Sequence, residues 1–214
     1  RNNKTNRISV LDGFKISSNY VFRRLVLDHY GDNPQKFIDR LYGYKLNNAY
    51  EFDLEEKGGT KSRVPDPGTS SWSRSTLPST AIGYSVMETP LNIVTFYNTI
   101  ANNGKMMKPY LVESIEKDGE IIKRFKPEIL NGAICSKSTA DTLLRALKTV
   151  TAEGTGSKVK KARCQVAGKT GTAWVVMDAK YTGGKGGIYQ DADGRKQYQG
   201  TFVGFYPADE PKYT

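Results

Sequence analysis

Hydrophobic residues recur at helical intervals in four stretches of the chain. The first predicted helix begins near Ser17, and the second covers residues 34–42. The third begins at Thr89-Pro90 and ends before Gly104, and the fourth covers residues 136–153. The ends of these stretches support the prediction. Hydroxyl and amide side chains before the first helix can cap it, and Pro90 occupies a first helical position, which proline tolerates.

Alternating or continuous hydrophobic runs predict strands elsewhere. Residues 110–116 and 121–125 flank Asp118-Gly119, a dipeptide typical of a tight hairpin turn. Three late runs, 165–167, 170–177 and 198–206, complete the predicted strands, and residues 47–78 are expected to be a loop. Helices in the middle of the chain and strands at its end predict an α+β fold, with helices packed on an antiparallel sheet.

Composition and charge limit the possible classes of function. The 214 residues are 37% hydrophobic, which suits one folded domain and excludes a disordered chain. The net charge of +10 is spread along the chain, apart from a cluster at 158–163, and no nucleic-acid-binding motif accompanies it, so no nucleic-acid partner is expected. A single histidine, His29, and two cysteines without a CxxC pattern, Cys135 and Cys164, predict neither a metal site nor a cofactor.

The segment Lys169-Thr170-Gly171-Thr172 is the first candidate for chemistry. A phosphate-binding loop is excluded, because Arg163 stands where that motif requires glycine and a strand rather than a helix follows. On a strand, Lys169 and Gly171 share one face and the two threonines share the other. The lysine offers a positive charge, Gly171 allows a substrate backbone to approach, and the hydroxyls can bind a carboxylate. A buried strand with a solvent-facing lysine is the alternative.

The penicillin-binding transpeptidases carry three motifs, which are S-x-x-K, S-x-N and K-T-G in chain order. Ser17-Ser18-Asn19 resembles the second motif, and Lys169-Thr170-Gly171 resembles the third. The chain is most similar to class B members of the cell-division (septal) type, and the elongation type remains an alternative. The segments that also share the resemblance are residues 82–84, 89–91, 101–104, 153–156, 166–173 and 202–208.

The resemblance implies a penicillin-binding transpeptidase or serine β-lactamase-like fold and a serine D,D-transpeptidase that cross-links peptidoglycan. Ser17, Asn19 and Lys169 would be catalytic, and Thr170, Gly171 and Thr172 would bind substrate. Implied ligands are D-Ala-D-Ala stem peptides and β-lactams, and implied partners are other division or elongation proteins bound through regions outside this chain. The implied location is the extracytoplasmic face of the cell envelope, with a membrane anchor outside these residues.

The nucleophile motif S-x-x-K is the main departure from the family pattern. Two literal matches exist, Ser114 with Lys117 and Ser157 with Lys160, but both follow Ser17, whereas the family places this motif before S-x-N. We therefore expect residues 1–214 to be part of one transpeptidase domain that lacks the nucleophile helix and the last strand of the sheet. This fragment is expected to be inactive alone. A non-catalytic sensor or scaffold is the alternative function, and a serine β-lactamase relative is a weaker one.

Overall fold

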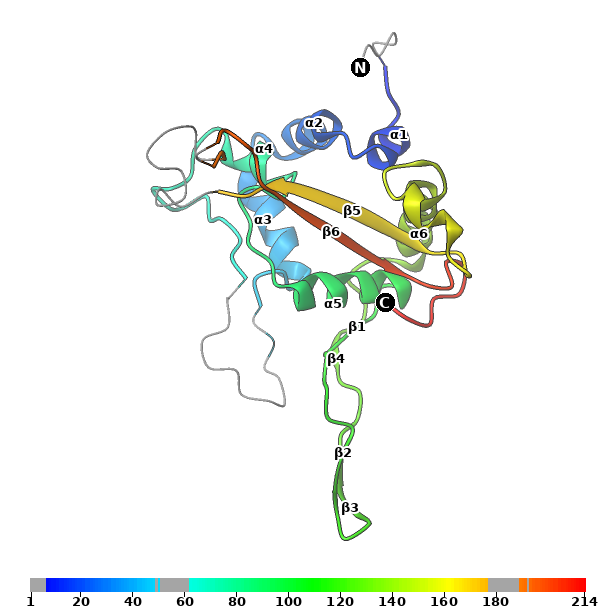
Figure 1. The fold of residues 1–214 in the computed structure, drawn as a ribbon. Helices are drawn as coiled ribbons and strands as arrows, with labels where there is room; N and C mark the ends of the chain where they lie inside the picture. The colour runs from blue at the N-terminus through cyan, green and yellow to red at the C-terminus, as the bar shows by residue number, and fades with distance from the viewer. Residues whose placement is uncertain (1–6, 49, 51–61, 177–188, 192) are drawn as a thin grey trace.

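A two-stranded antiparallel sheet crosses the molecule, and helices surround it (Figure 1). The computed structural model describes residues 7–48, 50, 62–176, 189–191 and 193–214. Strand β5 (Ala167–Trp174) pairs with β6 (Tyr198–Phe205), in register from Ala167 opposite Phe205 to Trp174 opposite Tyr198. Both late segments were predicted as strands of an antiparallel sheet, and their antiparallel pairing agrees with that prediction. The separate strand predicted at 165–167 is wrong, because β5 is continuous from Ala167; Met177, the predicted end of the next strand, lies outside the described residues.

Three short helices form the N-terminal part: α1 (Val10–Lys15), α2 (Asn19–Tyr30) and α3 (Pro34–Gly43). The Ser18 hydroxyl accepts a hydrogen bond from the Val21 amide and caps α2, so the predicted helix start is confirmed. Helix α3 extends one residue beyond its predicted end. Helix α1 was not predicted, because six residues are too few to show a helical period.

The remaining helices are α4 (Thr76–Thr80), α5 (Pro90–Ala101), α6 (Lys137–Glu153) and the 3₁₀ helix η1 (Ser157–Lys161). The two long helices begin where they were predicted to begin, and each start is capped by a hydroxyl side chain. Thr89 accepts from the Asn92 amide at the start of α5, and Ser136 accepts from the Thr139 amide at the start of α6. Helix α4 interrupts the end of the predicted 47–78 loop, most of whose first half lies outside the described residues.

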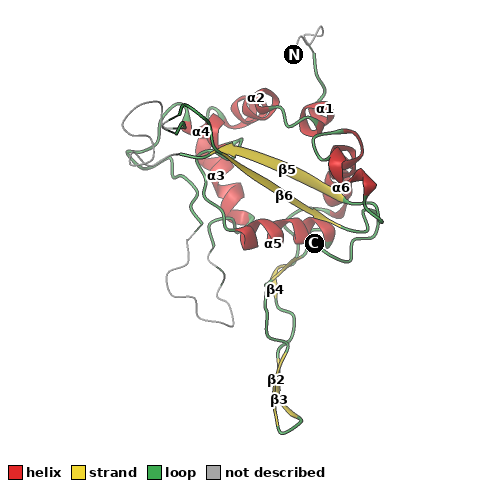
Figure 2. Cartoon of the chain, in the orientation of Figure 1, coloured by secondary structure: helices red, strands yellow, loops and turns green. Residues whose placement is uncertain are grey.

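The core joins α5 and α6 to the sheet, and Figure 2 shows these helices beside the two strands. Its buried members come from all four elements and from the segment after β6: Ile100, Leu147, Ala167, Phe205 and Ala208. Gly168 and Gly204 face each other across the strands, where an added Cβ on Gly168 would lie 2.5 Å from the Val203 carbonyl oxygen. Only glycine therefore fits this close crossing of the two backbones.

A long hairpin projects away from this body (Figure 1). Strands β1 (Met106–Met107) and β4 (Ile129–Asn131) pair at its base, and β2 (Ser114–Lys117) and β3 (Glu120–Arg124) pair at its tip. The Asp118-Gly119 turn was predicted, and both residues have the positive φ values, 54° and 84°, that a type I′ turn requires. Strand β2 is shorter than the strand predicted at residues 110–116. Among the described residues, no helix is both long and apolar enough to span a bilayer.

Candidate active site

Lys169 lies near the start of β5 and reaches toward the loop between α1 and α2. Its ammonium donates hydrogen bonds to the Ser17 hydroxyl and to the Thr170 carbonyl oxygen, the latter at 3.0 Å. The ring of Phe14 lies beneath the charge, with its centroid 5.9 Å from Nζ. Burial lowers the pKa of Lys169 below the ordinary 10.5. The structure thus brings together Ser17 and Lys169, two of the predicted catalytic residues.

Ser17 is held by the tight turn that joins α1 to α2. Its backbone is left-handed, with φ 56°, a conformation that costs a serine free energy and that is enriched at functional sites. The Ser17 amide donates to the Phe14 carbonyl oxygen at 3.1 Å, and the Ser18 amide donates to the Gly13 carbonyl oxygen at 2.8 Å. A Cβ on Gly13 would lie 2.8 Å from Val21, so the two helices meet where only glycine fits. This packing aims the Ser17 hydroxyl at Lys169.

Thr155 completes the cluster from the end of α6. Its hydroxyl lies 2.7 Å from the Thr170 hydroxyl and 3.3 Å from the Ser17 hydroxyl, so the three side chains form one hydrogen-bonded chain. The Thr155 amide also donates to the Lys15 carbonyl oxygen at 3.3 Å, which joins α6 to α1. Sequence reasoning did not name Thr155 as a site residue. Its only signal was the family resemblance of residues 153–156.

The other predicted site residues lie around this cluster without such bonds. Asn19 is exposed at the first position of α2, one residue beyond the cap. Thr172 is exposed two residues after Thr170 on the same strand. An added Cβ on Gly171 would clash with the Thr201 hydroxyl oxygen on β6, so a side chain here would require the exposed Thr201 side chain to rotate. The predicted role of Gly171 in admitting a substrate backbone stays a prediction.

The cluster has the chemistry of a proton relay beside an anion site. A lysine whose neutral form is favoured by burial can exchange a proton with a serine hydroxyl that it already contacts. Figure 1 shows α1 and α2 on the side of β5 that faces away from β6, so the cluster occupies the edge of β5 that β6 leaves open. The edge of a strand offers backbone donors and acceptors to an extended ligand.

Neither literal S-x-x-K match belongs to this cluster. Ser114 lies on the projecting hairpin, where its hydroxyl donates to the Glu116 carboxylate at 3.1 Å. Ser157 and Lys160 lie on η1, where three residues per turn place them on one side of the helix. Yet Ser157 is exposed to solvent, and Lys160 lines a pocket together with Arg163 that includes neither Ser17 nor Lys169. The spacing alone would have allowed this pair; its location argues against it.

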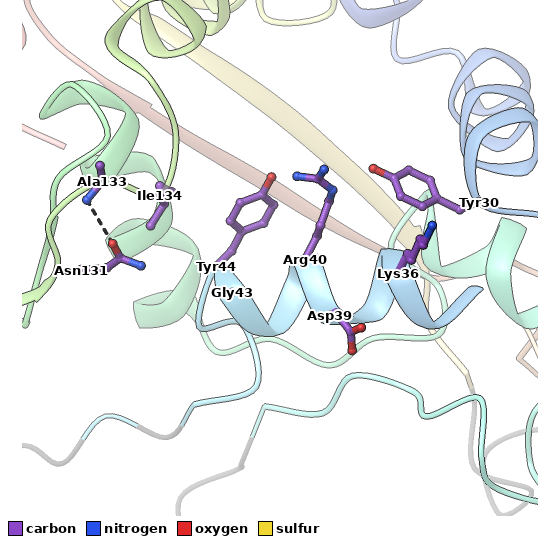
Figure 3. Close-up of a pocket in the computed structure, with 9 residues that line it drawn as sticks. All are labelled: Tyr30, Lys36, Asp39, Arg40, Gly43, Tyr44, Asn131, Ala133 and Ile134. Atoms are coloured by element: carbon purple, nitrogen blue, oxygen red, sulfur yellow. Dashed lines mark hydrogen bonds between the residues drawn. The ribbon is translucent and has the colours of Figure 1, made fainter. Parts of the chain in front are cut away.

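A pocket of about 480 Å³ lies elsewhere, along α3 (Figure 3). Figure 3 shows Tyr44 and Arg40 rising from α3, and Tyr30 pointing along that helix toward Arg40. Neither Ser17 nor Lys169 lines this pocket, so its size does not make it the site of the relay chemistry. In the part of the chain that the structure describes, no group of three or more His, Cys, Asp or Glu side chains is arranged to hold a metal ion. Cys135 and Cys164 are free thiols.

Comparisons with known proteins agree with this geometry. The family model described as the penicillin-binding protein transpeptidase domain matches residues 1–214. The chain is 32% identical over 196 residues to penicillin-binding protein PbpB of Mycolicibacterium smegmatis, covering 84% of this chain and 26% of that protein. It is 30% identical over 185 residues to peptidoglycan D,D-transpeptidase MrdA of Acinetobacter baumannii, covering 81% of this chain and 26% of that protein.

The fold agrees as well. The structure of penicillin-binding protein 3 from Mycobacterium tuberculosis complexed with aztreonam superposes with a TM-score of 0.75 and 26% identity, covering 96% of this chain and 43% of that one. The chain spans about a quarter of the length of the curated relatives it matches. The predicted α+β penicillin-binding fold is confirmed, and the chain belongs to the penicillin-binding protein transpeptidase domain family.

Proposed function

We propose that this chain supplies the acyl-donor side of a peptidoglycan D,D-transpeptidase site. The observation that carries the proposal is the hydrogen-bonded cluster of Lys169, Ser17, Thr155 and Thr170 at the open edge of β5. A relative of 30% identity is named a peptidoglycan D,D-transpeptidase, and a structural neighbour is complexed with aztreonam, a β-lactam. Both support a site that accepts D-Ala-D-Ala stem peptides and β-lactams.

The reaction proceeds by acyl transfer through a serine. The serine Oγ bonds to the penultimate D-Ala carbonyl carbon and loses its proton, the C–N bond to the terminal D-Ala breaks, and the leaving nitrogen takes a proton. An amine of a neighbouring stem peptide then attacks the acyl carbon, and the serine recovers its proton. When the serine attacks a β-lactam, the C–N bond of the four-membered ring breaks, but the other ring atoms keep the leaving nitrogen attached to the acyl group. The leaving group therefore does not depart, and the acyl-enzyme persists.

Each site residue has a role in this scheme. Ser17 relays the proton to the leaving nitrogen, and Lys169 sets the local potential and exchanges that proton. The hydroxyls of Thr170 and Thr172 bind the terminal carboxylate, and the Thr172 amide donates to the oxyanion. Asn19 hydrogen-bonds the substrate amide or the lysine of the nucleophile motif, and Gly171 lies beside the substrate backbone. No step needs a metal or cofactor.

We further assign residues 1–214 to part of one transpeptidase domain whose S-x-x-K nucleophile lies outside them. The positions of Ser114 and Ser157, both outside the cluster, support this assignment. The intact enzyme would work at the extracytoplasmic face of the cell envelope, held by a membrane anchor outside these residues. A role in cell division, with other division proteins as partners, follows from the septal resemblance.

A non-catalytic sensor or scaffold is the second candidate function. The observation in its favour is that, within the described residues, no serine of an S-x-x-K sequence joins the Lys169 cluster. The two functions differ in one measurable property, which is a covalent bond to a β-lactam.

The first prediction tests that bond. Incubated with benzylpenicillin, the full-length protein should gain one β-lactam mass, and the 214-residue chain alone should gain none. Intact-protein mass spectrometry measures this gain.

A second prediction concerns Lys169. In the full-length protein, Lys169→Ala should slow acylation at least tenfold. Thr172→Ser should slow it less, because serine keeps the hydroxyl. Stopped-flow acylation measures both rates. Lys126→Ala, at an exposed position, controls for lost charge.

No adduct on the full-length protein would favour the scaffold. Equal acylation rates in the wild type and Lys169→Ala would remove Lys169 from the mechanism. An adduct on the short chain that maps to Ser114 or Ser157 would show that the nucleophile lies within these residues.

A further inference from the structure

An aromatic and cationic cluster lies at the far end of the same strand. The Trp174 ring is the centre of this cluster and is 40% exposed. The Lys196 ammonium lies 3.8 Å from the centroid of the indole ring, and the Tyr189 ring packs against it edge-on, with centroids 5.5 Å apart and planes at 61°. Tyr198, 57% exposed, lies directly opposite Trp174 on β6. The cluster therefore presents a partly exposed aromatic surface and a positive charge at one place on the strand.

The cluster is fixed to the body of the protein through the backbone of Trp174. Its amide donates a hydrogen bond to the Tyr84 hydroxyl at 3.3 Å, and Tyr84 lies on a turn whose Gly83 has φ 86°. The Tyr84 amide in turn donates to the Ser79 carbonyl oxygen at 3.0 Å, at the end of α4. The end of β5 is therefore connected to a second segment, which gives the indole a defined position beside the strand.

Strand geometry relates this indole to the relay cluster. Thr170, Thr172 and Trp174 alternate with the other residues of β5 and so share one face. Two residues along a strand span about 6.6 Å, so Trp174 lies roughly that far beyond Thr172. If Thr172 binds the carboxylate of a ligand extended along β5, the side chain on the acyl half of that ligand lies within reach of the indole.

We propose that Trp174 and Lys196 form a subsite for the side chain on the acyl half of the ligand, and that it favours planar groups bearing a negative charge. This inference rests on the proposed function, because it places the ligand along β5. The indole offers a flat apolar surface, and Lys196 offers the positive charge. The neighbouring Arg195 is paired with Asp193 at 3.4 Å, which leaves Lys196 as the cation over the ring.

Three penicillins isolate the two contributions. Benzylpenicillin, carbenicillin and ampicillin share one nucleus and one phenyl ring, and they carry a hydrogen, a carboxylate and an ammonium group respectively on the carbon between them. The measurement is the second-order acylation rate constant of each, on the full-length protein. We expect carbenicillin to be favoured over ampicillin, and Lys196→Gln to lower their rate ratio about two- to fivefold. Trp174→Leu should slow all three, because each loses the surface under its phenyl ring.

Lys212→Gln is the matched control. It removes the same charge at the opposite end of β6, where the Lys212 amide donates to the Tyr206 carbonyl oxygen. It should leave the carbenicillin-to-ampicillin ratio unchanged, which separates the local effect of Lys196 from the general attraction of a protein with a net charge of +10 for anions.

The outcomes separate the inference from the function beneath it. Absence of any benzylpenicillin adduct overturns the transpeptidase proposal and the subsite with it. Normal benzylpenicillin acylation, with the same rate ratio in the wild type and Lys196→Gln, overturns the subsite alone. A fall in the ratio that Lys212→Gln reproduces overturns it as well, because the effect then belongs to net charge.

Discussion

Lys169 carries its amine in a setting that disfavours the charged form. Burial lowers its pKa, while the hydrogen bonds to Ser17 and Thr170 keep Nζ at one position. A lysine with these two properties exchanges a proton with its neighbour more readily than an exposed lysine does. The left-handed backbone of Ser17 is part of the same arrangement, because it brings the hydroxyl to the amine.

The pH dependence of stability tests this setting. The unfolded chain binds more protons than the folded chain between the lowered pKa of Lys169 and 10.5, so the free energy of unfolding rises with pH in that window. Lys169→Met removes this contribution. The stability of the wild type relative to Lys169→Met should therefore increase as the pH rises from neutral toward 10.5. Urea unfolding of the chain at a series of pH values measures it.

Lys126→Met, at an exposed position, is the control for lost charge. Parallel pH profiles for the wild type and Lys169→Met would mean that burial does not shift the pKa of this amine.

At the scale of elements, the junction of α6 with α1 positions the site. An added Cβ on Gly154 would clash with the Lys15 carbonyl oxygen, and the next residue, Thr155, bonds to both Ser17 and Thr170. Lys15 also forms an ion pair with Glu153 at 3.4 Å across this junction, and one with Asp12 at 3.1 Å within α1. Because these pairs are exposed, the close backbone contact rather than the charges fixes the distance between the helices.

Gly154→Ala should therefore disturb both stability and function. The methyl group has no room, so the helices must separate, at a cost of about 1–3 kcal/mol. Because Thr155 moves with α6, acylation of the full-length protein by benzylpenicillin should also slow. Thermal unfolding and stopped-flow acylation measure the two effects. Gly132→Ala is the matched control, because nothing lies within 4 Å of its added Cβ. A Gly154→Ala protein with wild-type stability and acylation rate would refute this role for the junction.

Sequence patterns predicted those elements whose signals are local. Asp118-Gly119 predicted its hairpin, and Thr89-Pro90 predicted the start of its helix, because turns and helix starts depend on neighbouring residues. Residues that act through distant contacts gave no such signal. Thr155 became a site residue only through Ser17 and Thr170, and the short α1 is helical in the context of its packing on α6.

At the scale of the whole molecule, the projecting hairpin is separate from the body that holds the site. All residues of β3 are exposed, and none of β2 or β3 belongs to the hydrophobic core. The Phe125 amide donates to the Glu113 carbonyl oxygen at 2.9 Å, so the two strands already meet below the tip. The tip therefore adds surface to the molecule without supporting the site.

Removal of the tip tests this separation. If residues 114–124 are replaced by Asn-Gly, the hairpin should close at Glu113 and Phe125 with a two-residue turn. The melting temperature should change by only a few degrees, and benzylpenicillin acylation should stay within about twofold of the wild-type rate. Phe205→Ala, in the buried core, is the contrasting variant and should cost about 3–5 kcal/mol. Loss of acylation on removing the tip would give the hairpin a functional role.

The distance along the chain between the members of the relay has a consequence for biogenesis. Ser17 and Lys169 are 152 residues apart, and a ribosome adds about 5–20 residues per second, so roughly 8–30 s pass between their syntheses. For that whole interval the turn after α1 lacks its lysine partner, and its threonine partner, Thr155, is added only shortly before Lys169. A nascent chain therefore cannot form the proton relay, and a polypeptide released before residue 169 lacks the lysine that contacts Ser17. The complete site can therefore form only in chains whose synthesis has passed residue 169.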